Sequence, residues 1–442
     1  MFNAKNMKLT PIIGLEVHIE LSTHNKMFCN CLADHFGTEP NTQICPVCLG
    51  MPGTLPVPNK QALINTIKIA KALNCKINNE FIFARKHYFY PDLPKGYQIT
   101  QFQDPVGSDG WIEIGGKKIR INRVHIEEDT GKLLHEKDES LVDFNRAGVP
   151  LVEIVSEPDF HKTEEVIAYL KEVRLIVRNL AVAEARMERG QMRLEPNISL
   201  TSNVSKLPDY KVEVKNINSF RFVKGAIKYE IKRQTKILAK GKTPKQETRG
   251  YDSNDGKTFF QRSKETTTEY RYFPEPDIPP VVFEKDEIEK IVRAMPETRT
   301  DKIKRFVNDY QIKEESVRKI VEDKKKADYF EAVWKEIVDK GNKDKKYGQQ
   351  IANFIINKKH LIGLPPKEFA GKIVESMKTK RVDENILQII LGEVLEDHQG
   401  LVGEYKQGKH EVLNFLIGKA MSMSKGKLNA IVIKEGLIKR LN

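Results

Sequence analysis

The chain has 442 residues, of which 31% are charged and 39% hydrophobic, and its formal charge is +13. This composition excludes a disordered chain, and no apolar run approaches the ~18 residues that cross a bilayer. The first residues show no signal or transit peptide pattern, so we expect a cytoplasmic protein without membrane segments. The positive charge favours a polyanionic partner, although a generally basic cytosolic protein would carry it too.

Short β runs and a few helices alternate in the first part of the chain. Apolar runs bounded by Gly and Pro predict strands at 11–21, 111–124, 151–155 and 211–214. Apolar residues at three- and four-residue spacing predict helices at 59–73, 162–181 and 218–240. The Pro-rich segment 274–280 cannot continue a helix or a central strand, so it is predicted to leave the first domain as an extended segment. We therefore expect an α+β protein whose first domain, residues 1–283, mixes α and β structure.

From Asp286 onward the pattern is almost purely helical, with an apolar stripe in each of several short segments. All five cysteines precede this change. Gly363 with Pro365 and Pro366 interrupts the helical pattern, which places a second boundary there. The sequence thus predicts an all-α domain at 284–364 and a small all-α tail domain at 365–442.

Four of the cysteines form the first chemically specific pattern. Cys29 and Cys31 are followed, after a 13-residue loop, by Cys45 and Cys48. Two thiolate pairs brought together by a loop fit a tetrahedral Zn²⁺ and leave no open position for catalysis. The loop 29–48 is therefore predicted to hold a structural zinc, and an unmetallated loop or a redox pair of Cys45 and Cys48 are the alternatives. Cys75 lies in an apolar stretch and is read as a buried residue.

Acidic residues and a histidine on strand-like segments form a second pattern. Glu16 and His18 are two residues apart, so on a strand they share one face while Leu15, Val17 and Ile19 occupy the other. Further acids come from two other segments: Glu127, Glu128, Asp129 and Glu153. Such a face can hold Mg²⁺ with open positions for phosphate oxygens. Ion pairs on half-buried strands are the alternative interpretation.

Basic and aromatic residues alternate between Arg85 and Gln103. Rings that stack and cations that meet phosphate suit a lid over a nucleotide or an RNA end, whereas the alternative is a turn-rich loop with its rings packed inward. Segments 190–200 and 211–222 add polar residues at alternating positions of predicted strands: Arg193, Glu195, Asn197, Lys215, Asn216 and Asn218. The chain has no G-x-x-x-x-G-K-[ST] or G-x-G-x-x-G motif, so any ATP site is of another kind.

Several long motifs occur in the order GLEVHIEL, CPVCLGMPGTLPVPN, KHYFYPDLPKGYQITQ, HIEEDTGKLLH, SLVDFNRAGVPLVEIVSEPDF, VKNINSF and EYRYFPEPDIPP. Over residues 11–280 they closely resemble the GatB/GatE family, the B subunits of aspartyl/glutamyl-tRNA amidotransferases. The C-terminal stretch from Gly408 is similar to that family's YqeY-like tail domain, and residues 1–283 to its cradle domain. Glu195 stands where the family usually has Asp, which leaves its role less secure than that of Arg193.

The resemblance implies a two-step reaction on Glu-tRNA(Gln) or Asp-tRNA(Asn). ATP phosphorylates the side-chain carboxylate, and ammonia then displaces phosphate to give the amide. It implies a catalytic face that binds Mg²⁺ through Glu16, His18, Glu128 and Glu153. Glu127 is the nearest alternative to Glu128 as a ligand. It also implies that the ATP phosphates and the aminoacyl end are surrounded by Lys86, Tyr88, Tyr90, Lys95, Tyr97, Arg193, Lys215 and Asn216.

The ammonia source is expected in another chain, because this one lacks the glycine- and serine-rich Ser-Ser-Lys signature of amidase-type glutaminases. The resemblance implies an amidase A subunit and a small C subunit in a heterotrimer, with mis-acylated tRNA as substrate. A tRNA-binding or assembly protein without kinase activity is the alternative from another class. A GatE-like enzyme restricted to tRNA(Gln) is a second alternative, and the length leaves little room for its extra domain.

Overall fold

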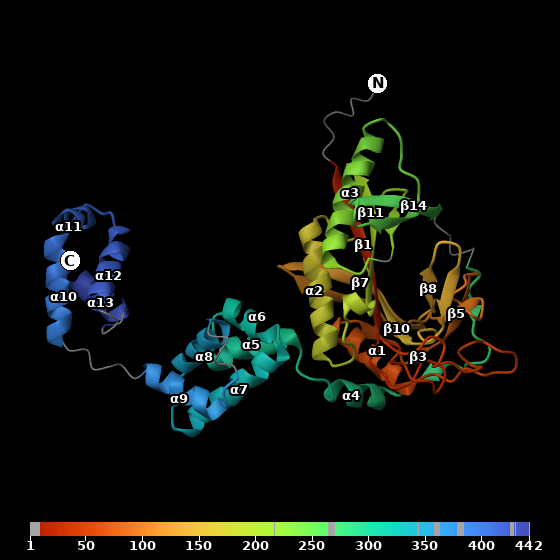
Figure 1. Ribbon diagram of the computed structural model, residues 1–442, viewed down its shortest axis with the longest axis horizontal. Helices are drawn as coiled ribbons and strands as arrows, with labels where there is room; N and C mark the ends of the chain where they lie inside the picture. The colour runs from red at the N-terminus through yellow and green to blue at the C-terminus, as the bar shows by residue number, and fades with distance from the viewer. Residues whose placement is uncertain are drawn as a thin grey trace. The chain divides into compact units, whose positions relative to one another are not determined.

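The computed structural model describes residues 9–215, 217–263, 270–342, 344–357, 363–377, 384–424, 428 and 430–441. Contacts divide the chain into two compact units, Met1–Lys302 and Ile303–Asn442 (Figure 1). The first unit is built on a large sheet and the second is helical. The predicted α+β class is therefore confirmed. Within the described part of the chain, no helix has both the length and the apolar character that a membrane crossing requires.

A nine-stranded sheet forms the centre of the first unit. Its strands, in spatial order, are β14 (Lys257–Ser263), β13 (Glu247–Asp252), β12 (Val212–Val214), β11 (Met192–Thr201), β1 (Thr10–Glu20), β10 (Pro150–Ser156), β7 (Lys117–Glu128), β6 (Gly107–Ile114) and β2 (Lys76–Ile77). Neighbours are antiparallel except the parallel pair β12 and β13. β1 lies in the middle, so both of its edges are paired with neighbouring strands.

Three helices cover one face of this sheet: α1 (Lys60–Ala72), α2 (Thr163–Asn179) and α3 (Phe220–Leu238). They begin and end within two residues of the predicted ranges. The Asn59 side chain caps α1 by accepting from the backbone N–H groups of Gln61 and Ala62, which explains where that helix starts. α2 and α3 pack side by side, as Figure 1 shows. Their apolar stripes and the inward side chains of the strands form one hydrophobic core.

The expected strand at 111–124 is wrong as a single run. Gly115 and Gly116 both have positive φ and form a two-residue turn between β6 and β7, with Ile114 paired to Lys117. Two glycines at φ > 0 give the turn geometry that matches the twist of a hairpin. Apolar residues on both sides of the turn made the two strands look like one.

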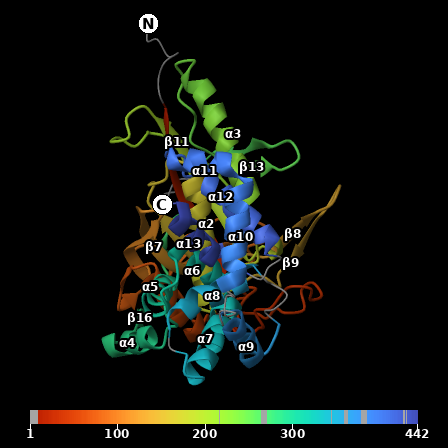
Figure 2. The ribbon, with the colours of Figure 1, turned by 90° about the vertical axis from the view of Figure 1, so that its left-hand side faces the viewer.

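Short strand pairs surround the large sheet. β4 (Ala84–His87), β5 (Tyr97–Thr100) and β15 (Phe273–Pro274) form a three-stranded sheet that borders β7, and β3 (Glu80–Phe81) pairs with β16 (Val281–Val282). The hairpin of β8 (Lys132–His135) and β9 (Ser140–Asp143) projects from the unit in Figure 2. A 3₁₀ turn, Met187–Arg189, precedes β11. The helix α4 (Lys285–Arg293) packs on α1 and so belongs to this unit.

The second unit contains two hydrophobic cores. One is formed by α5 (Arg299–Tyr310), α6 (Glu314–Val321), α7 (Lys324–Asp339), α8 (Lys346–Asn357) and α9 (Pro366–Met377). The other is formed by α10 (Glu384–Asp397), α11 (Gln399–Lys406), α12 (Val412–Met423) and α13 (Ala430–Leu441). α9 packs on α7 through Phe369, although the sequence placed it in the tail domain. Pro366 is the first residue of this helix, a position that suits proline. The domain boundaries at 283 and 364 otherwise stay predictions.

Candidate active site and metal centres

One face of the large sheet is apolar and the other is charged, and β1 shows the division most clearly. Leu15, Val17 and Ile19 are completely buried in the core, while Glu16 and His18 point to the opposite face. This is the alternation that the sequence predicted. His18 pairs in register with Arg193 on β11 and with Glu153 on β10, and Glu153 pairs with His125 on β7. A row of polar side chains therefore crosses four strands on the charged face.

A first potential metal cluster consists of His18, Glu127 and Glu153, whose ligand atoms all lie within 4.8 Å of one another. His18 Nε2 is 3.4 Å from Glu153 Oε2 and 3.7 Å from Glu127 Oε1. His125 supports the cluster from β7, with its Nε2 3.1 Å from Glu153 Oε2. Burial disfavours the imidazolium, but the carboxylates of Glu153, Glu195 and Glu127 outweigh it and raise the pKa of His18 to about 9.

Glu127, and not Glu128, belongs to this cluster, so of the expected set Glu16, His18, Glu128 and Glu153 only His18 and Glu153 lie in it. Adjacent residues of a strand point to opposite faces, so only one of the two glutamates can join His18. Glu128 Oε2 lies 2.5 Å from Lys95 Nζ, and its other oxygen accepts a hydrogen bond from the backbone N–H of Ile99. Both side chains are nearly buried and line a cavity of about 200 Å³ together with Cys29 and Cys48. The ammonium of Lys95 is thus already paired with the carboxylate of Glu128.

A second potential metal cluster lies beside the first and consists of Glu16, Glu195 and Glu213, again with ligand atoms within 4.8 Å. Burial and the charges of Glu153, Glu213 and Glu195 raise the pKa of Glu16. Lys215 Nζ, at 3.4 Å from Glu195 and 3.7 Å from Glu213, balances part of this charge. Glu213 was missed in the sequence, although it alternates with Val212 and Val214 in the way that singled out Glu16.

The clusters fit divalent cations differently. An all-oxygen set such as the second cluster matches Mg²⁺, whereas a set with one imidazole is also typical of softer ions. Burial and, after it, repulsion from neighbouring carboxylates raise the pKa of Glu16, and a bound cation relieves that repulsion. The residues present therefore fit Mg²⁺, with Glu127 beside His18 and Glu153 in the first cluster and Glu16 in the second.

The remaining predicted site residues have diverse surroundings. Arg193 donates to both oxygens of Asp129, at 2.8 and 2.9 Å. Lys86 Nζ lies over the rings of Tyr270, at 4.8 Å, and Tyr88, at 5.8 Å. Tyr97 contacts Arg85 at 4.3 Å, and Tyr90 is exposed. Asn216 lies outside the described residues. Burial has the largest effect on the pKa values of Lys86 and Tyr88, and the charge of Glu127 helps to raise both, so these members of the aromatic stretch lie near the acidic face.

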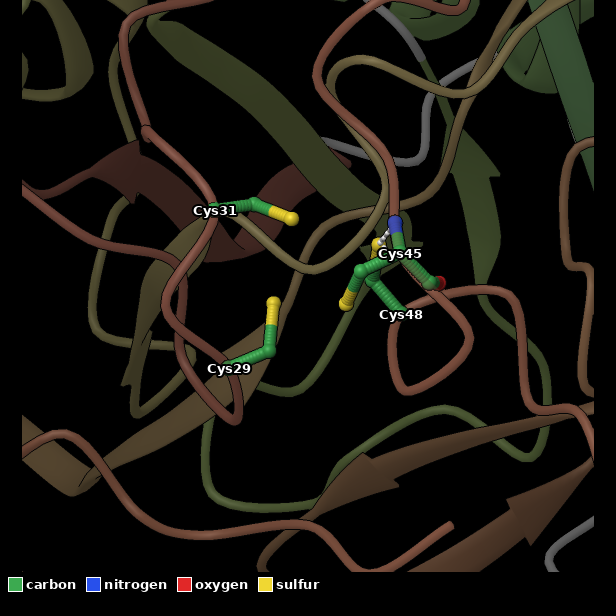
Figure 3. A group of neighbouring side chains, drawn as sticks. All are labelled: Cys29, Cys31, Cys45 and Cys48. Carbon is green, nitrogen blue, oxygen red and sulfur yellow. Dashed lines mark hydrogen bonds between the residues drawn. The ribbon is translucent and has the colours of Figure 1, made fainter.

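The four cysteines come together as the sequence predicted. Cys29, Cys31, Cys45 and Cys48 are free thiols whose sulfurs lie within 4.8 Å of one another and point to a common centre (Figure 3). Tetrahedral Zn–S bonds of about 2.3 Å put the sulfurs about 3.8 Å apart, which lies inside this limit. A hydrogen bond from Cys29, aided by the ammonium of Lys26, lowers the pKa of Cys48 to about 4 although burial opposes it. The cluster therefore already favours one thiolate.

Two protein-family models match this chain. The model of the GatB/GatE catalytic domain matches residues 11–289, the part of the chain that contains both acidic clusters and the four cysteines. The model of the GatB domain matches residues 335–441. The first unit is therefore a catalytic domain of the GatB/GatE class.

Relatives are similar over almost the whole chain. The B subunit of the aspartyl/glutamyl-tRNA(Asn/Gln) amidotransferase of Persephonella marina is 43% identical, over 97% of this chain and 98% of its own. The B subunits of Thermosipho melanesiensis and Clostridium acetobutylicum are 42% and 40% identical, over 98% and 99% of this chain and 99% and 100% of their own. The chain belongs to this family of tRNA-dependent amidotransferase B subunits, which are carbon–nitrogen ligase components.

Proposed function

We propose that this chain carries out the ATP-dependent transamidation of mis-acylated Glu-tRNA(Gln), Asp-tRNA(Asn) or both, through an acyl phosphate, to give Gln-tRNA(Gln) or Asn-tRNA(Asn). The observation that carries the proposal is the pair of three-ligand clusters on neighbouring rows of one sheet face. Two groups of carboxylates in one half-buried site suit a nucleotide whose phosphates need divalent cations.

The chemistry explains why a carboxylate must first be phosphorylated. An oxygen of the glutamate or aspartate side chain attacks the γ-phosphorus of ATP, the bond to the bridging oxygen breaks, and ADP leaves with the bonding pair. Ammonia then attacks the acyl carbon, the C–O bond to phosphate breaks, and a proton from nitrogen passes to the phosphate. A carboxylate has no comparable leaving group, so the amide does not form without the first step.

Residues of both clusters would hold Mg²⁺: His18, Glu127 and Glu153 in the first, and Glu16, Glu195 and Glu213 in the second. The ion supplies charge neutralisation of the phosphates. Burial lowers the pKa of Lys86, but nearby groups, among them Tyr272 and Glu127, raise it by more, so its ammonium lies near the first cluster, where it would bind a phosphate or the substrate carboxylate. Glu128 and Lys95 act differently, because their ion pair forms the wall of the cavity beside the cysteine loop.

A structural Zn²⁺ in the loop 29–48 is part of the proposal, because four thiolates close the coordination shell. Ammonia comes from a glutaminase partner, the amidase-type A subunit, and a small C subunit completes a heterotrimer in the cytoplasm. The +13 charge suits the tRNA, whose phosphates it attracts. The preference between the two mis-acylated tRNAs depends on the charging enzymes of the cell.

The test uses the heterotrimer with ATP, Mg²⁺, glutamine and each mis-acylated tRNA in turn. His18→Ala and Glu16→Ala are expected to abolish amide formation and substrate-dependent ATP cleavage while tRNA binding persists. Glu164→Ala, which changes an exposed glutamate on α2, is the matched control and is expected to retain full activity. Wild-type protein that binds tRNA but forms neither acyl phosphate nor amide would refute the proposal and favour a binding module.

A further inference from the structure

Arg123 differs from three of the cations around the acidic face, each of which a carboxylate holds. Arg193 is bound by Asp129, Lys215 by Glu195 and Glu213, and Lys95 by Glu128. Within the described ranges, no carboxylate or other hydrogen-bond acceptor pairs with Arg123, and its Nε is buried without a partner. A buried donor without an acceptor is costly in a folded protein. A bound ligand that supplies the missing acceptor for the Nε–H of Arg123 would remove this free-energy cost.

A local irregularity of β7 directs Arg123 to the charged face. Ile119 and Ile121 point into the core, so strict alternation would bury residue 123 on the same side. The pairing with β10 shifts here, since Val155 pairs with Arg123 but Ser156 pairs with Ile121. Asn122 is thus an extra residue, as in a β-bulge, and such bulges redirect side chains beside active sites. After the bulge, Val124 faces the core.

The pairing register also places Arg123 relative to both clusters. Arg123 pairs with Val155 on β10, and Val155 pairs with Glu16 on β1, so along this row only Val155 stands between residue 123 and Glu16 of the second cluster. His125, two residues further along β7, contacts Glu153 of the first cluster. Burial raises the pKa of Tyr272, and the charges of Lys86 and Arg123 partly offset that rise. Arg123, Lys86 and Tyr272 therefore lie in one neighbourhood of the acidic face.

We propose that Arg123 binds the phosphoryl group that passes from ATP to the substrate carboxylate. The inference rests on the proposed function and adds a catalytic residue to it. A guanidinium offers two parallel N–H donors that match two phosphate oxygens, and it keeps its charge at every physiological pH. As the bond to ADP breaks and the bond to the carboxylate oxygen forms, negative charge is spread over the three non-bridging oxygens. Arg123 stabilises that charge, and no proton moves in this step.

The experiment compares Arg123→Gln and Arg123→Lys with wild-type heterotrimer in a single turnover of ATP and mis-acylated tRNA. Formation of the acyl phosphate is expected to slow by about 100-fold or more in Arg123→Gln, since loss of one transition-state donor has this effect. In Arg123→Lys the charge remains but the paired donors are lost, so a decrease of about tenfold is expected. Arg120→Gln, on the same strand but exposed and bound to Asp159, is the matched control and should react at the wild-type rate.

A second measurement is independent of turnover. The dissociation constant of ATP with Mg²⁺, measured by calorimetry, is expected to increase by about tenfold in Arg123→Gln and to stay unchanged in Arg120→Gln. Free guanidinium should restore part of the rate of Arg123→Ala. Wild-type rate and ATP affinity in Arg123→Lys, or in a folded Arg123→Gln, would overturn this inference while leaving the proposed function intact. Failure of wild-type protein to form the acyl phosphate would instead refute the proposed function.

Discussion

Exchanging the two adjacent glutamates one at a time separates their roles. Glu127→Gln removes a carboxylate from the first metal cluster, whereas Glu128→Gln leaves the ammonium of Lys95 facing an amide. Lys95 and Glu128 are only 8% and 3% exposed, so solvent screens their pair weakly. Breaking a buried ion pair from one side costs about 3–5 kcal/mol. The glutamine can still accept from the N–H of Ile99, so we expect the lower end, about 3 kcal/mol.

At about 2 °C per kcal/mol for a unit of this size, Glu128→Gln should lower the unfolding temperature by about 6 °C. Glu127→Gln should change it by much less and instead raise the Mg²⁺ concentration needed for ATP cleavage. Circular dichroism during heating and a Mg²⁺ titration of substrate-dependent ATP cleavage measure the two effects, with Glu164→Gln as an exposed control. An unchanged unfolding temperature in Glu128→Gln together with an increased Mg²⁺ requirement would show that Glu128 is the ligand, contrary to the strand alternation.

Three further predictions concern the neighbouring groups. Burial opposes ionisation of Asp129, but Arg193 and Arg146 overcome it and hold the pKa of Asp129 below its ordinary value, so its ion pairs stabilise the fold above about pH 4 and less as the pH falls further. Unfolding at pH 7 and pH 3 should therefore show a destabilising effect of Asp129→Asn that shrinks in acid; an equal effect at both values would contradict it. Cys45→Ser should lower the zinc content, measured by native mass spectrometry, and expose the loop 29–48 to proteolysis, while Cys75→Ser should leave the zinc in place. Glu213→Gln should weaken Mg²⁺-dependent ATP binding in calorimetry, and wild-type binding would exclude Glu213 as a ligand.

Local periodicity was sufficient for much of the fold. Helices at 60–72 and 163–179 have apolar stripes strong enough to mark both ends within two residues. The alternation of Glu16 and His18 with Leu15 and Val17 was visible because a central strand must bury one face. The cysteine cluster could be predicted for a related reason, since ligand spacing is a local property of the chain.

The features that the sequence did not show depend on pairing between distant strands. The choice between Glu127 and Glu128 required the phase of β7, which the extra residue at Asn122 shifts. Glu213 lies beside Glu16 only because β12 pairs with β11. Arg193 forms an ion pair with Asp129, which directly follows β7. The sequence also did not show that α9, which Pro366 begins, packs on α7, because that contact joins helices distant in the chain.

The cavity beside Glu128 has walls of two different origins. Its sheet side comes from the ends of β5 and β7, which the hydrophobic core fixes, while Cys48, Gly50 and Met51 supply the opposite side from the cysteine loop. Gly50 has positive φ, and a Cβ there would collide with Lys95 Cγ, so the loop backbone presses directly on the lysine. Under the proposed function, the Zn²⁺ of the cysteine loop would hold the loop side of this cavity in place without taking part in the reaction. Loss of that ion would then loosen the loop backbone that packs on Lys95 and disturb the buried Lys95–Glu128 ion pair.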